Sequence, residues 1–143
     1  MSAAPMISVE TTVTAPIALV WQAYTTPRDI VKWNAPSDDW HTTKAVVDLR
    51  VGGSFSSRME AKDGSTGFDF AGTYTAIVPQ KLIAYAFDDR TAEVTFTEVA
   101  GGVALRVHFE AETTNSVDMQ KGGWQAILNN FKRYVEIQAA GHG

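Results

Sequence analysis

The feature that most constrains the fold is a two-residue alternation of apolar and polar side chains between residues 43 and 111. The clearest example is "VALRVHFEAE", whose alternating apolar side chains are Val103, Leu105, Val107 and Phe109. Successive side chains of a strand point to opposite faces, so each such run buries one face. Turns of hairpin length, such as "KDGSTG", "VPQK" and "AGG", separate the runs. About six strands connected in this way predict an antiparallel sheet with one apolar face.

A further strand and two short helices are predicted before this region. The stretch "ISVETTV", residues 7–13, has the apolar spacing of a strand. One helical face then follows at spacings of three and four residues, formed by Ile17, Val20, Trp21 and Tyr24. Thr14 is its expected N-cap. A second short helix is predicted from an N-cap at Thr26 to about Lys32, with a proline in its first turn.

The last segment is predicted to be a long amphipathic helix. Its apolar face consists of Trp124, Ile127, Leu128, Phe131 and Val135. The opposite face is polar and is formed by Gln125, Asn129, Lys132 and Arg133. Ser116 or Asn115 is expected to cap the helix. Gly122 and Gly123 weaken its first turns, and we expect them to allow another chain segment to approach closely.

Together these elements predict a single α+β domain over residues 1–143, with a core at about residues 7–138. We expect a helix-grip arrangement, in which a curved antiparallel sheet of six to seven strands surrounds the long C-terminal helix. The two short helices follow the first strand. A curved sheet cannot close perfectly around one helix, so we expect a cavity lined by inward-facing aromatic side chains.

Composition excludes several classes of protein. The net charge is −4, so we expect neither a nucleic acid nor an anionic membrane as a partner. The chain has no cysteine, which excludes disulfides, thiolate metal sites and a cysteine nucleophile. The N-terminal stretch "MSAAPMISVE" lacks the pattern of a signal peptide, and no apolar run is long enough to span a membrane. We therefore expect a cytoplasmic protein, for which a homodimer is possible.

The stretch "KWNAPSDDWH", residues 32–41, contains several polar side chains that could act in catalysis or ligand binding. Asp39 and His41, with Tyr85 elsewhere in the chain, are the candidates for acid–base catalysis or for the polar rim of a pocket. A metal site needs at least three converging ligands, which this loop cannot supply alone. His108 lies on the polar face of a predicted strand, and His142 lies in a terminal "GHG". We therefore expect neither a bound metal nor a cofactor.

Aromatic side chains are the main candidates for ligand binding. Trp33 and Trp40 flank this loop, so each is either a plug of the core or a gate of the cavity. The residues expected to face the cavity are Met59, Phe68, Phe70, Tyr74, Tyr85, Phe87, Trp124 and Leu128. Tyr74, Tyr85 and Trp124 also carry polar tips, which would orient a bound molecule.

Five stretches in order give the chain a resemblance to a known family. They are "VWQAYTTPRDIVKW", "DLRVGGSFSSRME", "FAGTYTAIVPQKLIAYAF", "VTFTEVAGGVALRV" and "GWQAILNNFKRYVE". The chain resembles, from about Val9 to Glu136, the family named for the activator of the heat-shock protein 90 ATPase. That family belongs to the START-like (SRPBCC) superfamily, which also contains polyketide cyclases and lipid carriers. The resemblance implies a helix-grip fold with a deep hydrophobic cavity.

Fold alone does not decide among the functions of such a superfamily. The leading hypothesis is a domain that binds a small hydrophobic or aromatic molecule in its cavity. One alternative is a cyclase- or hydrolase-type enzyme that uses the same cavity. Another alternative is an interaction module associated with a chaperone. A polar group deep in the cavity with a strongly shifted pKa would favour the enzyme, whereas a large apolar patch outside it would favour the interaction module.

Overall fold

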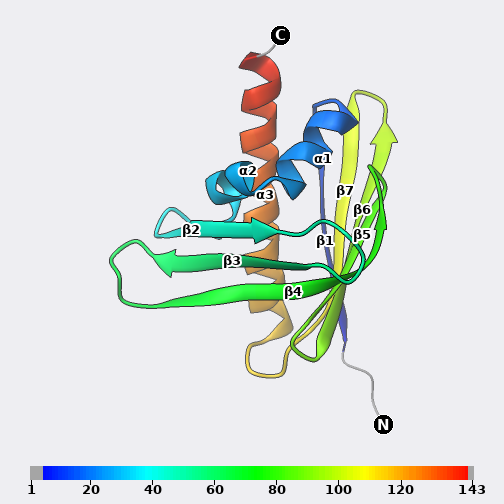
Figure 1. The fold of residues 1–143 in the computed structure, drawn as a ribbon. Coiled ribbons are helices and arrows are strands. Elements are labelled where there is room, and N and C mark those ends of the chain that lie inside the picture. Colours follow the sequence, from blue (N-terminus) through cyan, green and yellow to red (C-terminus); the bar gives the residue numbers. More distant parts are fainter. Residues whose placement is uncertain (1–4, 142–143) are drawn as a thin grey trace.

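The computed structural model describes residues 5–141, and its strands form one antiparallel sheet (Figure 1). The strands are β1 (Met6–Val13), β2 (Trp40–Val47), β3 (Ser54–Ala61), β4 (Gly67–Val78), β5 (Leu82–Phe87), β6 (Arg90–Val99) and β7 (Gly102–Glu110). Their order across the sheet is β1-β7-β6-β5-β4-β3-β2. The predicted meander is therefore confirmed, and β1 adds a seventh strand beside β7. The first four residues and His142 lie outside the described part.

Three helices complete the predicted element order: α1 (Ile17–Thr25), α2 (Pro27–Trp33) and α3 (Val117–Gly141). Ser116 caps α3, because its Oγ accepts a hydrogen bond from the backbone N–H of Met119 at 3.1 Å. The prediction that Thr14 caps α1 is wrong. Pro16 takes that position, while the backbone N–H of Thr14 donates to Glu136 Oε2 at 2.8 Å. Within the described residues, no helix is long and apolar enough to cross a membrane.

Strand β2 begins earlier than the sequence predicts. The alternation was expected to begin at residue 43, but Trp40 already pairs with Ala61 on β3 and opens the strand. The register of this pair shifts between Thr42 and Lys44, and a second shift on β4 lies between Tyr74 and Ala76. Such irregularities bend strands, so both contribute to the curvature of the sheet around α3.

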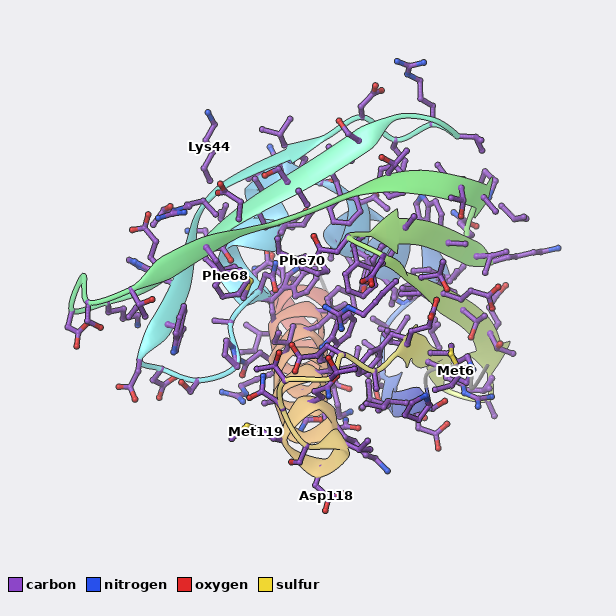
Figure 2. All side chains as sticks on the ribbon, turned by 90° about the horizontal axis from the view of Figure 1, so that it is seen from below. Met6, Lys44, Phe68, Phe70, Asp118 and Met119 are labelled. Carbon is purple, nitrogen blue, oxygen red and sulfur yellow. The ribbon has the colours of Figure 1, made fainter. Side chains whose placement is uncertain are left out.

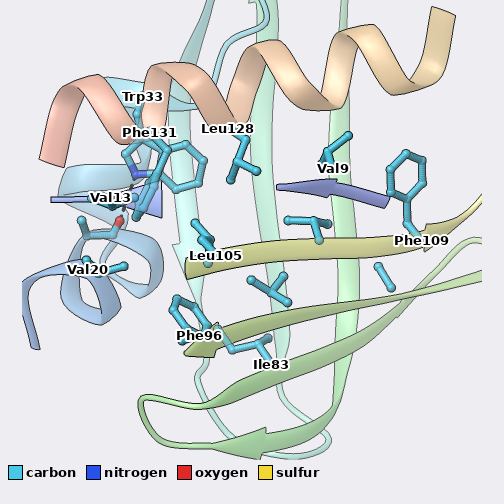
Figure 3. Close-up of a cluster of buried hydrophobic side chains, with 14 of the residues drawn as sticks. Val9, Val13, Val20, Trp33, Ile83, Phe96, Leu105, Phe109, Leu128 and Phe131 are labelled. Carbon is cyan, nitrogen blue, oxygen red and sulfur yellow. Dashed lines mark hydrogen bonds between the residues drawn. The ribbon is translucent and has the colours of Figure 1, made fainter. Parts of the chain in front are cut away.

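The apolar face of α3 packs on the inward face of the sheet, as predicted (Figure 3). Leu128, Phe131 and Val135 are buried, and the inward residues of β7 are buried with them. Phe131 is fully buried and meets the rings of Trp33 and Tyr24 edge-on, at centroid distances of 4.9 and 5.2 Å. Trp33 is fixed in turn by a hydrogen bond from its indole Nε1 to the carbonyl of Ala23. Helices α1 and α2 are thereby held against α3.

The polar face of α3 covers the outer edge of β1. The side chain of Gln125 bonds both backbone groups of Glu10, and Lys132 Nζ donates to the carbonyl of Thr12 at 2.8 Å. Glu136 accepts from the N–H of Thr14 and pairs with Lys132. These contacts occupy edge groups that would otherwise offer a template for another strand. Periodicity predicted this helical face correctly, but could not show that it binds a strand.

The expected role of Gly122 and Gly123 is wrong. A Cβ atom added at either glycine would meet no atom within 4 Å, so no segment approaches the helix there. Gly123 instead lines the cavity described below, whereas Gly122 does not. The two glycines therefore differ in what their side-chain positions face, although they are neighbours on one helix.

Replacing Phe131 by Ala tests the packing of α3. The side chain is fully buried among aromatic rings, so we expect the free energy of unfolding to fall by about 3–5 kcal/mol. Chemical denaturation measures the change. Ile137→Ala is the matched control on the same helix, because Ile137 is 63% exposed and should change stability by less than about 0.5 kcal/mol. A loss below about 0.5 kcal/mol for Phe131→Ala would contradict the packing of this helix.

Candidate functional site

A cavity of about 790 Å³ lies between α3 and the part of the sheet formed by β3, β4 and β5. It exists because α3 packs on β1, α1 and α2, while the neighbouring strands curve away from the helix. Figure 2 shows Phe68 and Phe70 between β4 and α3, and Lys44 pointing away from the helix. The lining is mainly apolar and aromatic, as is usual for sites that bind small molecules.

Nine of the ten residues proposed for ligand binding line this cavity. They are Trp33, Trp40, Met59, Phe68, Phe70, Tyr74, Tyr85, Trp124 and Leu128. Phe87 is the exception. It is 2% exposed and packs among Tyr85, Phe70 and Trp124, with the Arg90 guanidinium 4.3 Å from its ring centroid. Phe87 therefore packs against residues of the lining but does not itself line the cavity.

Asp39 and His41 do not line the cavity. Trp40 lines the cavity from the start of β2, and alternation turns His41 outward, while Asp39 lies in the preceding turn. His41 is paired in register with Glu60, and the backbone carbonyl of Asp39 accepts a hydrogen bond from Lys62. No hydrogen bond or ion pair joins Asp39 to His41 in the described structure. The predicted polar rim and acid–base pair are therefore not formed at this site.

The most exposed lining residues mark the mouth of the cavity. Phe68 on β4 is 47% exposed, and Met119 in the first turn of α3 is 65% exposed. The ring of Trp40 lies 5.9 Å from that of Phe68, measured between centroids. Trp33 is only 6% exposed and belongs to the core at the side of α1 and α2. Of the two tryptophans in the "KWNAPSDDWH" stretch, Trp33 thus lies in the core and Trp40 lies at the mouth of the cavity.

Three tyrosines contribute polar atoms to a mainly apolar lining. Tyr74 and Tyr85 are direct partners across β4 and β5, and Tyr24 reaches the cavity from α1. Burial raises the pKa of all three phenols, that of Tyr74 to about 12, with the nearby Asp48 carboxylate adding to this shift. Tyr74 also raises the pKa of Tyr24 and of Tyr85, and Tyr24 raises the pKa of Tyr85. At neutral pH each is an uncharged hydroxyl that donates hydrogen bonds.

Phe55 is placed beside two of these tyrosines by a glycine on the next strand. Its ring centroid lies 5.2 Å from that of Tyr74 and 5.0 Å from that of Tyr85. The backbone partner of Phe55 is Gly72, where an added Cβ would come within 2.8 Å of the Phe55 ring. Any side chain at position 72 would therefore displace Phe55 from the cavity wall.

Gln120, in the first turn of α3, binds the loop between β7 and α3. Its side-chain amide nitrogen donates to the carbonyls of Glu112 and Asn115, and its oxygen accepts from the N–H of Glu112. The side chain is 7% exposed and also lines the cavity. These bonds fix the start of α3, and with it the position of Trp124, which stacks on Phe109 at 3.8 Å.

Several lining residues were missed by the sequence analysis, among them Tyr24, Phe55, Arg90, Met119 and Gln120. Helical spacing predicts Tyr24 on an apolar face, but such a face does not distinguish the core from a cavity wall. Arg90, Met119 and Gln120 lie beside turns, where no periodicity indicates direction. Within residues 5–141 there is no group of three histidine, aspartate or glutamate side chains arranged to hold a metal ion.

Comparison with known proteins identifies the family. The family described as "Activator of Hsp90 ATPase homolog 1-like protein" matches residues 14–136. The chain belongs to this family. The match covers both short helices, β2 to β7 and most of α3, so it includes every element around the cavity. Comparison with curated proteins gave no match.

Solved structures of similar proteins share the whole fold of this family member. A solution structure of an AHSA1-like protein from Aeromonas hydrophila is 45% identical, with a TM-score of 0.89, and the alignment covers 97% of this chain and 96% of that one. A solution structure from Cytophaga hutchinsonii is 41% identical, with a TM-score of 0.79 and 96% of each chain covered. A crystal structure from Chromobacterium violaceum is 26% identical, with a TM-score of 0.82, covering 92% of this chain and 96% of that one.

The tyrosine environment of this family member predicts its behaviour in alkali. All four tyrosines have raised pKa values, including Tyr134, whose hydroxyl donates to Asp29 and whose pKa is about 12. Unfolded tyrosines ionise near pH 10, so above that pH the unfolded state releases protons that the native state retains. The stability contributed by the tyrosines should therefore be fully present below about pH 10 and be lost from there towards pH 12.

Ultraviolet absorbance of phenolate, followed together with circular dichroism, measures both effects. We expect phenolate to appear only as the protein unfolds. Ionisation of all four tyrosines near pH 10 with the circular dichroism unchanged would contradict this description of the cavity.

Proposed function

We propose that this protein binds a small, largely apolar molecule inside the cavity between α3 and the curved sheet. The observation that carries the proposal is a cavity of about 790 Å³ lined mainly by aromatic and aliphatic side chains. This volume lies within the usual range of roughly 300–1,000 Å³ for ligand pockets. A bound molecule would remove this apolar lining from water, which is the main driving force for such binding.

The polar groups of the cavity favour binding over acid–base catalysis. A general base that works near neutral pH needs a pKa close to that pH. The pKa values of the three cavity phenols are shifted further above neutral pH, and Asp39 and His41 do not line the cavity. The enzyme alternative would therefore have to use these phenols as hydrogen-bond donors to substrate, instead of as bases. The apolar area at the cavity likewise favours a small molecule over a chaperone as the partner.

Trp40 is proposed to close the mouth of the cavity over the bound molecule. It contacts Phe68, which is half exposed, and it lines the cavity from the first position of β2. Trp33 is not assigned this role, because its hydrogen bond to Ala23 and its contact with Phe131 fix it in the core.

We also propose a cytoplasmic location, and a small molecule as the partner in preference to nucleic acid or membrane. The net charge of −4 would oppose binding to phosphate-rich partners, and a chain without cysteine depends on no disulfide for stability. A homodimer is compatible with this function, and light scattering during size-exclusion chromatography distinguishes it from a monomer.

Filling the cavity from α3 tests the proposal directly. Gly123 lines the cavity and Gly122 does not, although a new side chain at either position meets open space. Gly123→Leu should therefore weaken binding of N-phenyl-1-naphthylamine, a neutral apolar dye, by about tenfold or more. Gly122→Leu, the matched control, should leave the affinity within about twofold. Both changes should preserve or raise helix stability, because leucine is a better helix former than glycine.

Dye fluorescence measures both affinities, and native mass spectrometry of freshly purified protein looks for a molecule that already occupies the cavity. Absence of dye binding to the wild type would contradict the proposed function. Equal affinities for the two leucine variants would place the bound dye elsewhere.

Truncating Trp40 tests its role at the mouth. Trp40→Ala should weaken binding of the same dye by about 1–2 kcal/mol, the range expected for a rigid aromatic contact. The fold should persist, since Trp40 lies at the start of an edge strand. Val46→Ala is the matched control, because Val46 lies on the same strand, is 50% exposed and does not line the cavity. Equal affinity of wild type and Trp40→Ala would refute the gate.

A further inference from the structure

The hydroxyl groups of Tyr24, Tyr74 and Tyr85 have no hydrogen-bond partner among residues 5–141, although all three side chains line the cavity. Every fully buried side-chain oxygen or nitrogen of the described structure has a hydrogen-bond partner. The three hydroxyl oxygens have none, so each keeps some accessible surface on a side chain that lines the cavity. Polar groups in such surroundings normally find a partner, so a bound molecule can supply what the protein does not.

The surrounding residues hold these hydroxyls in place. Tyr74 and Tyr85 are opposite each other on neighbouring strands, and both pack on Phe55. Tyr24 is enclosed by Phe96, Phe131 and Trp33, with ring centroids 5.2–5.6 Å away. Rings packed in this way cannot rotate freely to find protein partners. Their hydroxyls are thus directed donors at fixed places, which is how polar groups orient a ligand in an apolar pocket.

We propose that these three tyrosine hydroxyls form a recognition site for a neutral hydrogen-bond acceptor, so that the ligand is an apolar molecule carrying a ketone, ester or amide carbonyl. This inference rests on the proposed function, because it names the chemistry of the molecule that the cavity takes.

The charges around the cavity favour a neutral group over an ionised one. The lining contains two charged residues, Arg90 and Glu112, and each is held by the protein. Arg90 donates to the carbonyl of Glu110 and lies over the ring of Phe87, while Glu112 accepts from the N–H of Asn115. Burial raises the pKa of Tyr85, and Arg90 is close enough to offset part of this rise, but the Arg90 guanidinium is already engaged by a carbonyl and an aromatic ring. An ionised ligand group placed among the phenols would therefore lose its hydration without gaining an unengaged opposite charge. The high pKa values of the phenols also keep them available as donors.

Two probes of similar shape separate the polar contribution from the apolar one. These are 2-acetylnaphthalene, which carries a ketone, and 2-isopropylnaphthalene, which replaces the carbonyl oxygen by a methyl group. Affinities for the wild type and for Tyr24→Phe, Tyr74→Phe, Tyr85→Phe and the triple variant are measured by tryptophan fluorescence. Each substitution removes one oxygen that makes no hydrogen bond within the described structure, so we expect folding to be preserved, which circular dichroism checks.

We expect the triple variant to bind the ketone about tenfold or more weakly than the wild type, because one or more hydrogen bonds are lost. The hydrocarbon should bind all variants within about twofold of the wild type. Tyr134→Phe is the matched control. Its hydroxyl bonds Asp29 outside the cavity lining, so this change should affect neither probe.

Infrared spectroscopy gives a second measurement that does not depend on comparing affinities. Hydrogen bonding lowers the carbonyl stretching frequency, so the bound ketone should absorb at lower frequency in the wild type than in the triple variant. Equal frequencies and equal ketone affinities in the two proteins, with both probes bound, would overturn the inference and leave the proposed function intact. Failure of both probes to bind the wild type would contradict the proposed function and the inference together.

Discussion

Burial of Leu128, Phe131 and Val135 against the sheet is the interaction on which the rest of the structure depends. It fixes α3 over the strands β1 and β7, and the rings of Trp33 and Tyr24 add α1 and α2 to the same core. One helix cannot fill the concave side of a sheet of seven strands. On β4 and β5, Phe70 and Phe87 meet Trp124 of α3, but other inward residues of β3, β4 and β5 face the cavity.

Polar contacts stabilise this asymmetric packing from the opposite side. Gln125, Lys132 and Glu136 of α3 bond backbone groups at the free edge of β1, so the helix is held to the strand along its length. Gln120 fixes the first turn of the same helix through the loop that precedes it. The cavity wall formed by α3 is thus attached to one half of the sheet only. Its other wall belongs to β3, β4 and β5, and the exposed Phe68 and Met119 lie where the two walls part.

Much of the fold followed from the sequence because alternation and helical spacing are local properties. The buried side chains of β7 and the apolar face of α3 are those that the pattern predicts. Local patterns failed where a neighbour distant in sequence decided the outcome. Trp40 opens β2 because Ala61 pairs with it, and the backbone N–H of Thr14 is bound by Glu136 of α3, while α1 begins three residues later with Pro16 at its N-cap. The glycines of α3 were expected to approach a neighbour, but face open space.

The sequence by itself determined which side chains point inward, since the parity of a strand is set by its own backbone. Parity placed Met59, Phe68, Phe70, Tyr74 and Tyr85 on the inward face, and all five line the cavity. Only the tertiary structure decided which inward residues meet a helix and which meet open space. Phe87 packs against Trp124, whereas Tyr85 on the same strand face lines the cavity. The same geometry brings Tyr24 from α1 to the cavity that Tyr74 and Tyr85 line, which no local pattern encodes.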